Sequence, residues 1–262
     1  MAIEIDWLGG EVKRAVKDFW RVRAGGDGVL SGKTLDEFVN IMRRVVNEYG
    51  LPNASICNGR CKAEVPGYFR PHKSWDTLVI DDKKLVAALE LKSQVGSIGN
   101  NFNNRTEEVL GSSLDLKTAI EEDAFGSNPN IFTGYIIVVE DSEESRTKPY
   151  IGMKHFPVMP GFLDDEGQRD VTYKPLPDGS YPRATGISYI NRYDVMCKRL
   201  MLKGYYTAAA VITASKVNAD TGEYGHVTVD TSIEAFMIKL ANHCQNIAAL
   251  KRLALGGTSY NN

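Results

Sequence analysis

The sequence lacks the features that mark secreted, membrane and motor proteins. Its 262 residues include four cysteines, too few and too scattered for a disulfide scaffold of this length. The longest apolar run, Tyr205 to Ala214, is too short to span a bilayer, and the amino terminus has neither a basic start nor an apolar signal core. No Gly-x₄-Gly-Lys-Ser/Thr loop occurs, so an NTP-driven motor is not indicated. We expect a soluble cytoplasmic protein.

Support for a zinc enzyme is also weak. The four histidines form no H-x₃-H or H-E-x-x-H arrangement. Cys57 and Cys61 make a C-x₃-C pair to which His243 and Cys244 could add ligands, but no second clustered pair has a recognised zinc spacing. Reduced thiols are the favoured interpretation, and a zinc set is the alternative.

Net charge does not identify a partner. Lys and Arg number 31 against 33 Asp and Glu, a balance of −2, and 43% of the residues are hydrophobic. This composition is ordinary for a globular protein, and a local basic cleft can bind nucleic acid without any excess of positive charge. Since no repeat, low-complexity tract or clear linker interrupts the chain, we expect a single domain over residues 1–262.

Hydrophobic spacing predicts an α/β protein with a mixed β-sheet flanked by helices. Two helices come first, and Thr34 with Glu37 forms a capping box for the second. Two strands follow within Ser74–Gln94, then a Gly and Asn loop, a helix from about Arg105 and a strand over residues 131–140.

The last third of the sequence predicts a helix, a buried strand and a long final helix. Ser188 caps the first helix, and a second capping box, Thr231 with Glu234, opens the last one. Before them, from Asp141 to about Thr185, the chain is polar and rich in proline. A loop of this length is more often functional than idle. A solvated loop without a partner is an equal alternative to contact with a charged surface. The basic residues that would suit such contact are Arg146, Lys148, Arg169, Lys174 and Arg183.

Charged residues stand at the ends of the two apolar strands in Ser74–Gln94. Asp76 opens the first strand, and Glu90 and Lys92, which share a face of the second, close it. Two carboxylates suit Mg²⁺, and a lysine beside them can hold or deprotonate a water or offset charge on a phosphorus centre. The pattern predicts metal-assisted hydrolysis of a phosphodiester. A salt bridge at the rim of the sheet is the alternative.

The hairpin register decides whether these groups can meet. Asp76 shares a face with Glu90 when the turn has an odd number of residues, which predicts the turn Asp82-Lys83-Lys84. A turn of Asp82 and Lys83 alone would place the carboxylates on opposite faces, unless a bulge intervened.

Asp76 followed by Glu90-Leu91-Lys92 resembles the motif of PD-(D/E)xK nucleases, with Trp75 where the proline would stand. Longer stretches between Val65 and Ser112 are similar to Type II restriction endonucleases of the XhoI and PaeR7I type: "VPGYFRPHKSWD", "LVAALELKSQVGS" and "GNNFNNRTEEVLGS". The resemblance implies a PD-(D/E)xK nuclease core and a Mg²⁺-dependent homodimer of a restriction-modification system. It would cut both strands of DNA within the palindrome CTCGAG and leave 5′ overhangs.

Two other functions fit the same motif. A repair or junction nuclease of this superfamily would cut by DNA structure, and a DNA-binding protein could keep the fold without turnover. The intact set of Asp76, Glu90 and Lys92 argues against a DNA-binding protein without turnover, because such a protein has no evident need of all three residues.

The resemblance suggests a role for each residue of the motif. Asp76 and Glu90 would bind the metal with the Leu91 carbonyl, and Lys92 would orient or activate the attacking water. Many such nucleases add an acid from a preceding helix. For that role Glu48 is preferred to Glu37, which the capping box already explains.

Polar residues around the motif are candidates for DNA contact. Those suited to phosphates are Arg70, His72 and Lys73. Gln94 would position water or phosphate, or is simply a polar residue at a strand end. The residues that follow the second strand could bind phosphates or base edges, and the candidates are Asn101, Asn104 and Arg105. The alternative is that these side chains cap the next helix. We expect base-reading residues in the Asp141–Thr185 segment.

Overall fold

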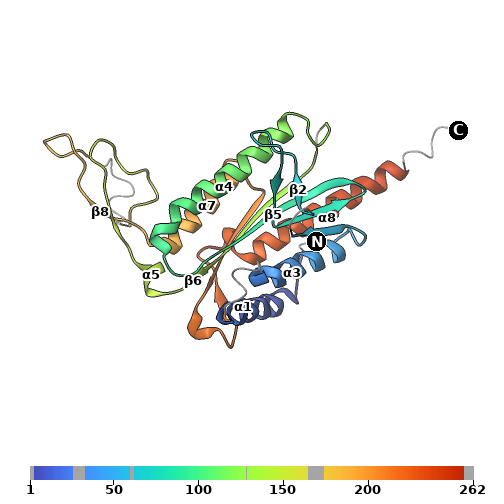
Figure 1. The fold of residues 1–262 in the computed structure, drawn as a ribbon, viewed down its shortest axis with the longest axis horizontal. Coiled ribbons are helices and arrows are strands. Elements are labelled where there is room, and N and C mark those ends of the chain that lie inside the picture. The colour runs from blue at the N-terminus through green and yellow to red at the C-terminus, as the bar shows by residue number, and fades with distance from the viewer. Residues whose placement is uncertain (1–2, 26–32, 60–61, 128, 165–173, 257–262) are drawn as a thin grey trace.

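A mixed sheet of six strands forms the centre of the computed structural model, which describes residues 3–25, 33–59, 62–127, 129–164 and 174–256 (Figure 1). The strands are, in spatial order, β1 (Ser55–Asn58), β4 (Thr77–Asp81), β5 (Lys84–Gln94), β6 (Phe132–Glu140), β9 (Ala208–Ala214) and β10 (Tyr224–Gly225). The pairs β1–β4, β4–β5 and β9–β10 are antiparallel, whereas β5–β6 and β6–β9 are parallel. This sheet with its flanking helices confirms the predicted fold class.

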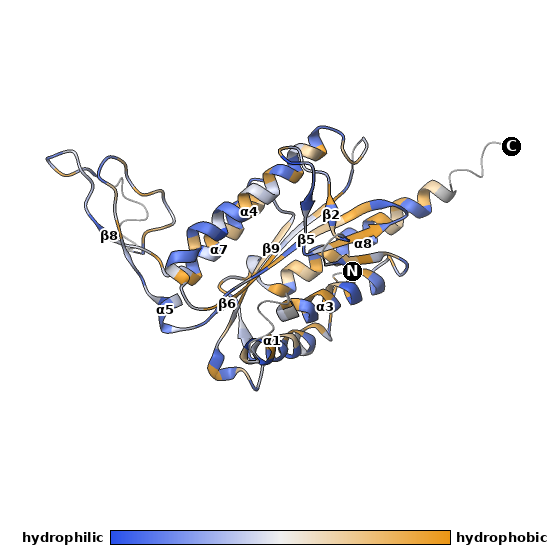
Figure 2. Ribbon diagram, in the orientation of Figure 1, coloured by the Kyte–Doolittle hydropathy of each residue, from blue (hydrophilic) through white to orange (hydrophobic). Residues whose placement is uncertain are grey.

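One face of the sheet is covered by three helices: α1 (Leu8–Ala24), α3 (Asp36–Glu48) and α8 (Ile233–Gly256) (Figure 1). Their apolar stripes are buried against the sheet, with Phe38 and Met42 of α3 fully enclosed and Leu240 of α8 in the same core. Figure 2 shows the central strands as predominantly hydrophobic, as expected for strands covered on both faces.

The other face is covered by α4 (Ile98–Glu121) and α7 (Tyr189–Leu202). Tyr135 and Ile137 of β6 are buried in this second core with Leu116 of α4. Figure 1 shows α4 lying across the sheet on the side opposite α1 and α3. Glu90 and Lys92 point into this layer, because they alternate with Leu89 and Leu91, which belong to the first core.

Helix α4 begins at Ile98, earlier than the predicted start near Arg105. The Gly and Asn sequence is helical because its apolar residues are anchored. Ile98 is fully buried, and the Phe102 ring lies 5.1 Å from that of Tyr193. A Cβ on Gly99 would come within 2.7 Å of the Tyr189 hydroxyl, so glycine permits this close packing. The asparagines predicted on a loop therefore lie on the helix.

Helix caps are partly as predicted. Ser188 caps α7, where its hydroxyl accepts a hydrogen bond from the Asn191 N–H. The two capping boxes are wrong, because a turn of 3₁₀ helix precedes each long helix and moves its start. After η1 (Lys33–Leu35) the N-cap of α3 is Leu35, and after η3 (Val229–Thr231) the Ser232 hydroxyl accepts from the Ala235 N–H at the start of α8.

The remaining elements are short. They are β2 (Glu64–Val65) paired with β3 (Lys73–Ser74), α5 (Glu143–Arg146), β7 (Tyr150–Ile151) paired with β8 (Ala184–Thr185), and η2 (Lys216–Asn218). The described residues between α5 and β8 project away from the sheet beyond one end of α4 (Figure 1). Arg169 of this segment lies outside the described residues.

Two expectations about composition can be compared with the structure. Within the described ranges, no helix combines the length and the apolar character that crossing a bilayer requires. Cys57, Cys197 and Cys244 are free thiols, whereas Cys61 lies outside the described ranges.

Candidate active site

The hairpin between β4 and β5 turns through only two residues, Asp82 and Lys83. Both have positive φ, 48° and 63°, as the favoured two-residue hairpin turn requires. The predicted three-residue turn is therefore wrong. A hairpin with this turn and no irregularity would place Asp76 and Glu90 on opposite faces.

A β-bulge restores the register that the two carboxylates need. Ile80 pairs with Leu85 but Val79 pairs with Ala87, which leaves Val86 as an extra residue on β5. The Val86 carbonyl accepts a hydrogen bond from His243 Nε2 of α8 at 3.1 Å.

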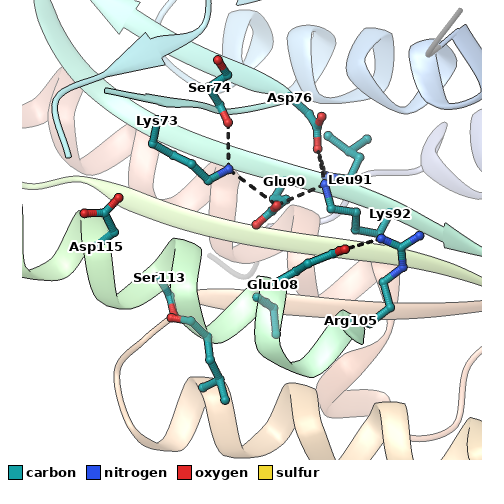
Figure 3. Close-up of polar contacts among 12 residues, drawn as sticks. Lys73, Ser74, Asp76, Glu90, Leu91, Lys92, Arg105, Glu108, Ser113 and Asp115 are labelled. Carbon is teal, nitrogen blue, oxygen red and sulfur yellow. Dashed lines mark hydrogen bonds and ion pairs between the residues drawn. The ribbon is translucent and has the colours of Figure 1, made fainter. Parts of the chain in front are cut away.

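Beyond the bulge Thr77 pairs with Leu89, so that the next positions, Asp76 and Glu90, lie opposite each other on one face. Asp76, Glu90 and Lys92 come together there (Figure 3). Lys92 Nζ lies 3.1 Å from Glu90 Oε1 and 3.4 Å from Asp76 Oδ2. The Leu91 N–H donates to Asp76 Oδ2 at 2.8 Å, which ties this exposed carboxylate to the backbone of β5. Both carboxylates thus converge on one cationic atom.

The site keeps Lys92 charged. Burial alone would lower the pKa of its ammonium, but attraction by Glu90 and then by Asp76 outweighs burial and raises that pKa above its usual value. Lys92 is therefore a cation at neutral pH in this arrangement. It can donate hydrogen bonds to a water or a phosphate oxygen, but it has no free lone pair with which to accept a proton.

Glu90 is the most enclosed member of the site, with 3% of its surface exposed. Its Oε2 accepts a hydrogen bond from the buried Tyr206 hydroxyl at 3.1 Å, and Lys73 Nζ lies 3.8 Å from Oε1. The sequence did not single out Tyr206, because it stands in an apolar run just before β9 and looks like an ordinary core residue.

Trp75 explains the departure from the nuclease motif. Its backbone N–H donates to the Ala63 carbonyl at 2.7 Å, and its side chain is buried in the core between the sheet and helices α4 and α7. A proline here would lose that hydrogen bond, because it has no N–H. Tryptophan thus holds Asp76 in place by backbone pairing and packing.

Helix α4 forms the opposite wall of the site. A pocket of about 450 Å³ is lined by Arg70, Lys73, Glu90, Lys92, Arg105, Glu107, Glu108, Gly111 and Ser112. Arg105 pairs with Glu108 at 2.6 Å across one turn of α4. No pattern in the sequence points to Glu107 or Glu108, because which face of α4 meets the sheet depends on tertiary packing.

The candidate DNA contacts fall into two groups. Arg70, Lys73 and Arg105 line the pocket, and His72 and Asn104 are exposed beside it. Gln94 and Asn101 are engaged locally instead: the buried Gln94 amide donates to the Gly96 carbonyl at 2.6 Å, and that of Asn101 to the Ser97 carbonyl at 3.1 Å. Gln94 is thus engaged at the end of β5, and Asn101 lies inside α4, whose start no side chain caps.

Glu48, the predicted additional acid, is not brought to the site. It lies on α3, which covers the other face of the sheet. Its carboxylate accepts hydrogen bonds from Arg44 Nε at 2.7 Å and Trp7 Nε1 at 2.9 Å. The Arg44 hydrogen bond lowers the pKa of Glu48. This pairing and the intervening sheet separate Glu48 from Glu90.

The donor set fits a hard divalent cation. Asp76 and Glu90 both pair with the Lys92 ammonium, so two carboxylates, which supply the oxygen ligands that Mg²⁺ prefers, face the same point of the site. No group of three His, Cys, Asp or Glu side chains in the described part of the chain could hold a metal. An ion bound by two carboxylates would keep several waters, as Mg²⁺ usually does.

Comparisons with known proteins agree with the geometry. The family model for restriction endonuclease XhoI matches residues 18–174 and 175–226. The chain is 40% identical to the Type II restriction enzyme XhoI of Xanthomonas vasicola, over 78% of this chain and 80% of the relative. It is 32% identical to the Type II restriction enzyme BstVI of Geobacillus stearothermophilus, over 85% of this chain and 92% of the relative.

A third relative, the Type II restriction enzyme AbrI of Azospirillum brasilense, is 42% identical over 60% of this chain and 77% of its own length. The search of solved structures found no match. The matched family model and the full-length relatives are sufficient to assign the family. The chain belongs to the XhoI family of Type II restriction endonucleases.

Proposed function

We propose that this restriction endonuclease acts as a Mg²⁺-dependent homodimer that hydrolyses one phosphodiester bond in each strand of a palindromic site. The site is CTCGAG, and the products carry 5′ overhangs, as the resemblance to the XhoI and PaeR7I type implies. The observation that carries the proposal is the convergence of Asp76 and Glu90 on Lys92 Nζ in a member of this family.

The residues of the pocket divide the chemistry among them. Asp76 and Glu90, with the Leu91 carbonyl, would hold Mg²⁺, which supplies Lewis-acid activation of a phosphate oxygen and of a bound water. Lys92 donates hydrogen bonds that orient the water for in-line attack, and its charge offsets the negative charge that builds on the phosphorus centre. The two carboxylates raise the pKa of the Lys92 ammonium, which keeps it protonated beside them as a hydrogen-bond donor.

Cations around the trio suit the DNA backbone. Lys73, beside Glu90, and Arg70, at the edge of the same pocket, are placed to contact the scissile phosphate and its neighbour. Asn104 and His72, exposed nearby, extend this surface. The overall charge of −2 is compatible with this role because the cations are local.

A homodimer follows from the symmetry of the substrate. A palindrome presents the same half-site twice, so two copies related by a two-fold axis read it with the same residues and cut one strand each. We place the base-reading residues in the segment between α5 and β8. It packs against α4, where Phe102 and Asn103 line a pocket together with Tyr150 and Arg183.

A cleavage assay with matched duplexes tests the proposal. The protein is incubated with Mg²⁺ and two duplexes that differ only by one CTCGAG site. Discrete cleavage of the site-bearing duplex, with a 5′ overhang at each end, is the expected result. Cutting at branches or mismatches without regard to sequence would support a junction nuclease, and binding without cutting would support a non-catalytic DNA-binding protein.

Glu90→Gln provides the internal control for the site. The substitution keeps the shape of the side chain and a carbonyl oxygen for Tyr206, so the fold and most DNA affinity are retained. Removal of the charge eliminates a metal ligand, and cleavage is lost. Turnover at the wild-type rate in Glu90→Gln would show that the active site lies elsewhere.

A further inference from the structure

One loop before the proposed catalytic residues carries two aromatic side chains that have no role in the chemistry described above. It is the loop Pro66–Pro71, "PGYFRP", which precedes Lys73 and Asp76. Tyr68 and Phe69 at its tip are 52% and 66% exposed, and their rings meet edge to face at 4.9 Å. Two neighbouring aromatic rings held in water are unfavourable for a free monomer, so they indicate a surface that is covered during function.

A buried carboxylate of α4 fixes this aromatic loop. Asp115, whose side chain is 1% exposed, accepts hydrogen bonds through Oδ1 from the N–H groups of Tyr68 at 2.8 Å and Phe69 at 2.9 Å. Its Oδ2 pairs with Arg70 Nε at 2.6 Å. Three successive residues of the loop are therefore held by one side chain. Burying a carboxylate is costly unless it is fully paired, and here the loop supplies the partners.

The loop backbone is also sterically restricted. A Cβ on Gly67 would lie 2.8 Å from Asp115 Oδ2 and 2.9 Å from the Arg70 backbone oxygen, so only glycine allows so close an approach. Pro66 and Pro71 restrict the backbone at both ends. The tip is thus preorganised before any ligand arrives, and a ligand does not have to order it.

The loop stands next to the catalytic pocket. Arg70 and Glu108 both line that pocket. Asp115 follows Glu108 by seven residues on α4, which is about 10 Å along the helix axis at the usual rise per residue. Figure 3 shows Asp115 and Glu108 on the same helix, α4, below Lys73 and Glu90 in this view. Because Arg70 and Glu90 line the same pocket, a duplex whose scissile phosphate lay at Glu90 would pass next to the loop.

We propose that the aromatic loop contacts the bound duplex, with Tyr68 and Phe69 placed against base or sugar edges in a groove and Arg70 against the adjacent phosphate. This inference rests on the proposed function, because it takes duplex DNA at the catalytic pocket as the occupant. Asp115 is the positioning residue that presents the loop. Apolar side chains contact thymine methyl groups or wedge against base steps, and such contacts add affinity without releasing counterions.

Salt dependence of DNA binding separates the apolar contact from the phosphate contacts. Binding of a labelled CTCGAG duplex is measured by fluorescence anisotropy without Mg²⁺, over a range of salt concentrations. Tyr68→Ala/Phe69→Ala should weaken binding by at least about tenfold, from lost apolar burial, with an unchanged slope of log affinity against log salt. Arg70→Ala should lower the slope by about one. Val217→Ala, which truncates an exposed apolar residue of η2, is the matched control and should bind like wild type.

Three results would overturn the inference. The double variant could bind with wild-type affinity, it could show a reduced salt slope, or it could change the sedimentation of the free protein, which would make the loop a contact between subunits. Cleavage of the same duplex by wild-type protein with Mg²⁺ is checked first. Failure of that cleavage would count against the proposed function, whereas normal affinity in the double variant would count against this inference alone.

Chymotrypsin, which cuts after aromatic residues, tests the positioning role of Asp115. The wild-type loop should resist cutting at Tyr68 and Phe69 despite their exposure. Asp115→Asn, which keeps an oxygen for the two N–H groups but loses the charge that pairs with Arg70, should be cut faster, and excess duplex should slow the cutting. Asp115→Ala, checked for folding by circular dichroism, should be cut faster still. Equal resistance in all three proteins would show that Asp115 does not hold the loop.

Discussion

Tyr206→Phe tests how the enclosed carboxylate of the active site is held. The substitution removes one hydroxyl and leaves the ring in its place. That hydroxyl donates to Glu90 Oε2 at 3.1 Å from a side chain that is almost completely buried. Burial, followed by the nearby charge of Glu90, raises the pKa of Tyr206 well above its usual value. The phenol therefore stays protonated and remains a donor throughout the working pH range.

The expected loss can be estimated from this geometry. A hydrogen bond to a charged acceptor contributes about 1.5–3 kcal/mol, and here Glu90 keeps Lys73 and Lys92 as partners. We take the lower end, about 1.5 kcal/mol, which corresponds to a factor of roughly ten. Tyr206→Phe should therefore raise the Mg²⁺ dissociation constant by about tenfold, because Glu90 is no longer fixed, and should lower the cleavage rate at subsaturating Mg²⁺ by the same factor.

Tyr135→Phe is the matched control for this measurement. Tyr135 is equally buried, its ring lies 5.8 Å from that of Tyr206, and its hydroxyl has no hydrogen-bond partner among the described residues. Mg²⁺ binding by calorimetry and single-turnover cleavage are compared in both variants. Equal losses in the two proteins, or wild-type Mg²⁺ affinity in Tyr206→Phe, would refute the positioning role.

Four further substitutions test other parts of the structure. Lys92→Met should abolish cleavage yet bind Mg²⁺ about tenfold more tightly by calorimetry, because the ammonium that competes for both carboxylates is gone; weaker binding would contradict this. Glu48→Gln should cleave at the wild-type rate, and a loss of cleavage beyond the loss of stability would restore Glu48 to the site. Burial lowers the pKa of His243 below 6.5. Because the unfolded chain then takes up the proton more readily, the free energy of unfolding should fall as the pH drops below 6.5. In urea titrations, His243→Gln should make the free energy of unfolding depend less on pH. Lys83→Gly should raise the free energy of unfolding by about 1 kcal/mol, since it relieves a positive φ; a lower melting temperature would be inconsistent with that turn.

The sequence predicted the layers of the fold well because its strands and helices have clear periods. The buried strands β6 and β9 and the stripe of α3 appear where expected. The helix starts were less accurate. Capping residues identify a helix start only when no 3₁₀ turn precedes it, and the asparagines of α4 favour a loop until Ile98 and Phe102 are anchored by tertiary contacts.

The sequence predicted which residues of one motif lie together, but it did not predict the neighbours that distant elements supply. Asp76, Glu90 and Lys92 come from one hairpin, so strand alternation was sufficient to bring them together once the register was right. Tyr206 and Asp115 reach the site only through β9 and α4, and no local pattern identifies them. Glu48 was chosen by its place before the hairpin in sequence, but the face that α3 covers is decided by packing.

The bulge at Val86 has a consequence for how this family changes in length. With a two-residue turn and a chain of this length, the bulge around Val86 is what keeps Asp76 opposite Glu90. A relative that lost one residue at this bulge would have a regular hairpin with the same pairing, whereas a single loss between the bulge and Glu90, with the bulge kept, would turn Glu90 into the core under α1 and α3. Single-residue gaps in alignments of this hairpin are therefore expected at the bulge or in the turn, and gaps elsewhere in it are expected to involve two residues.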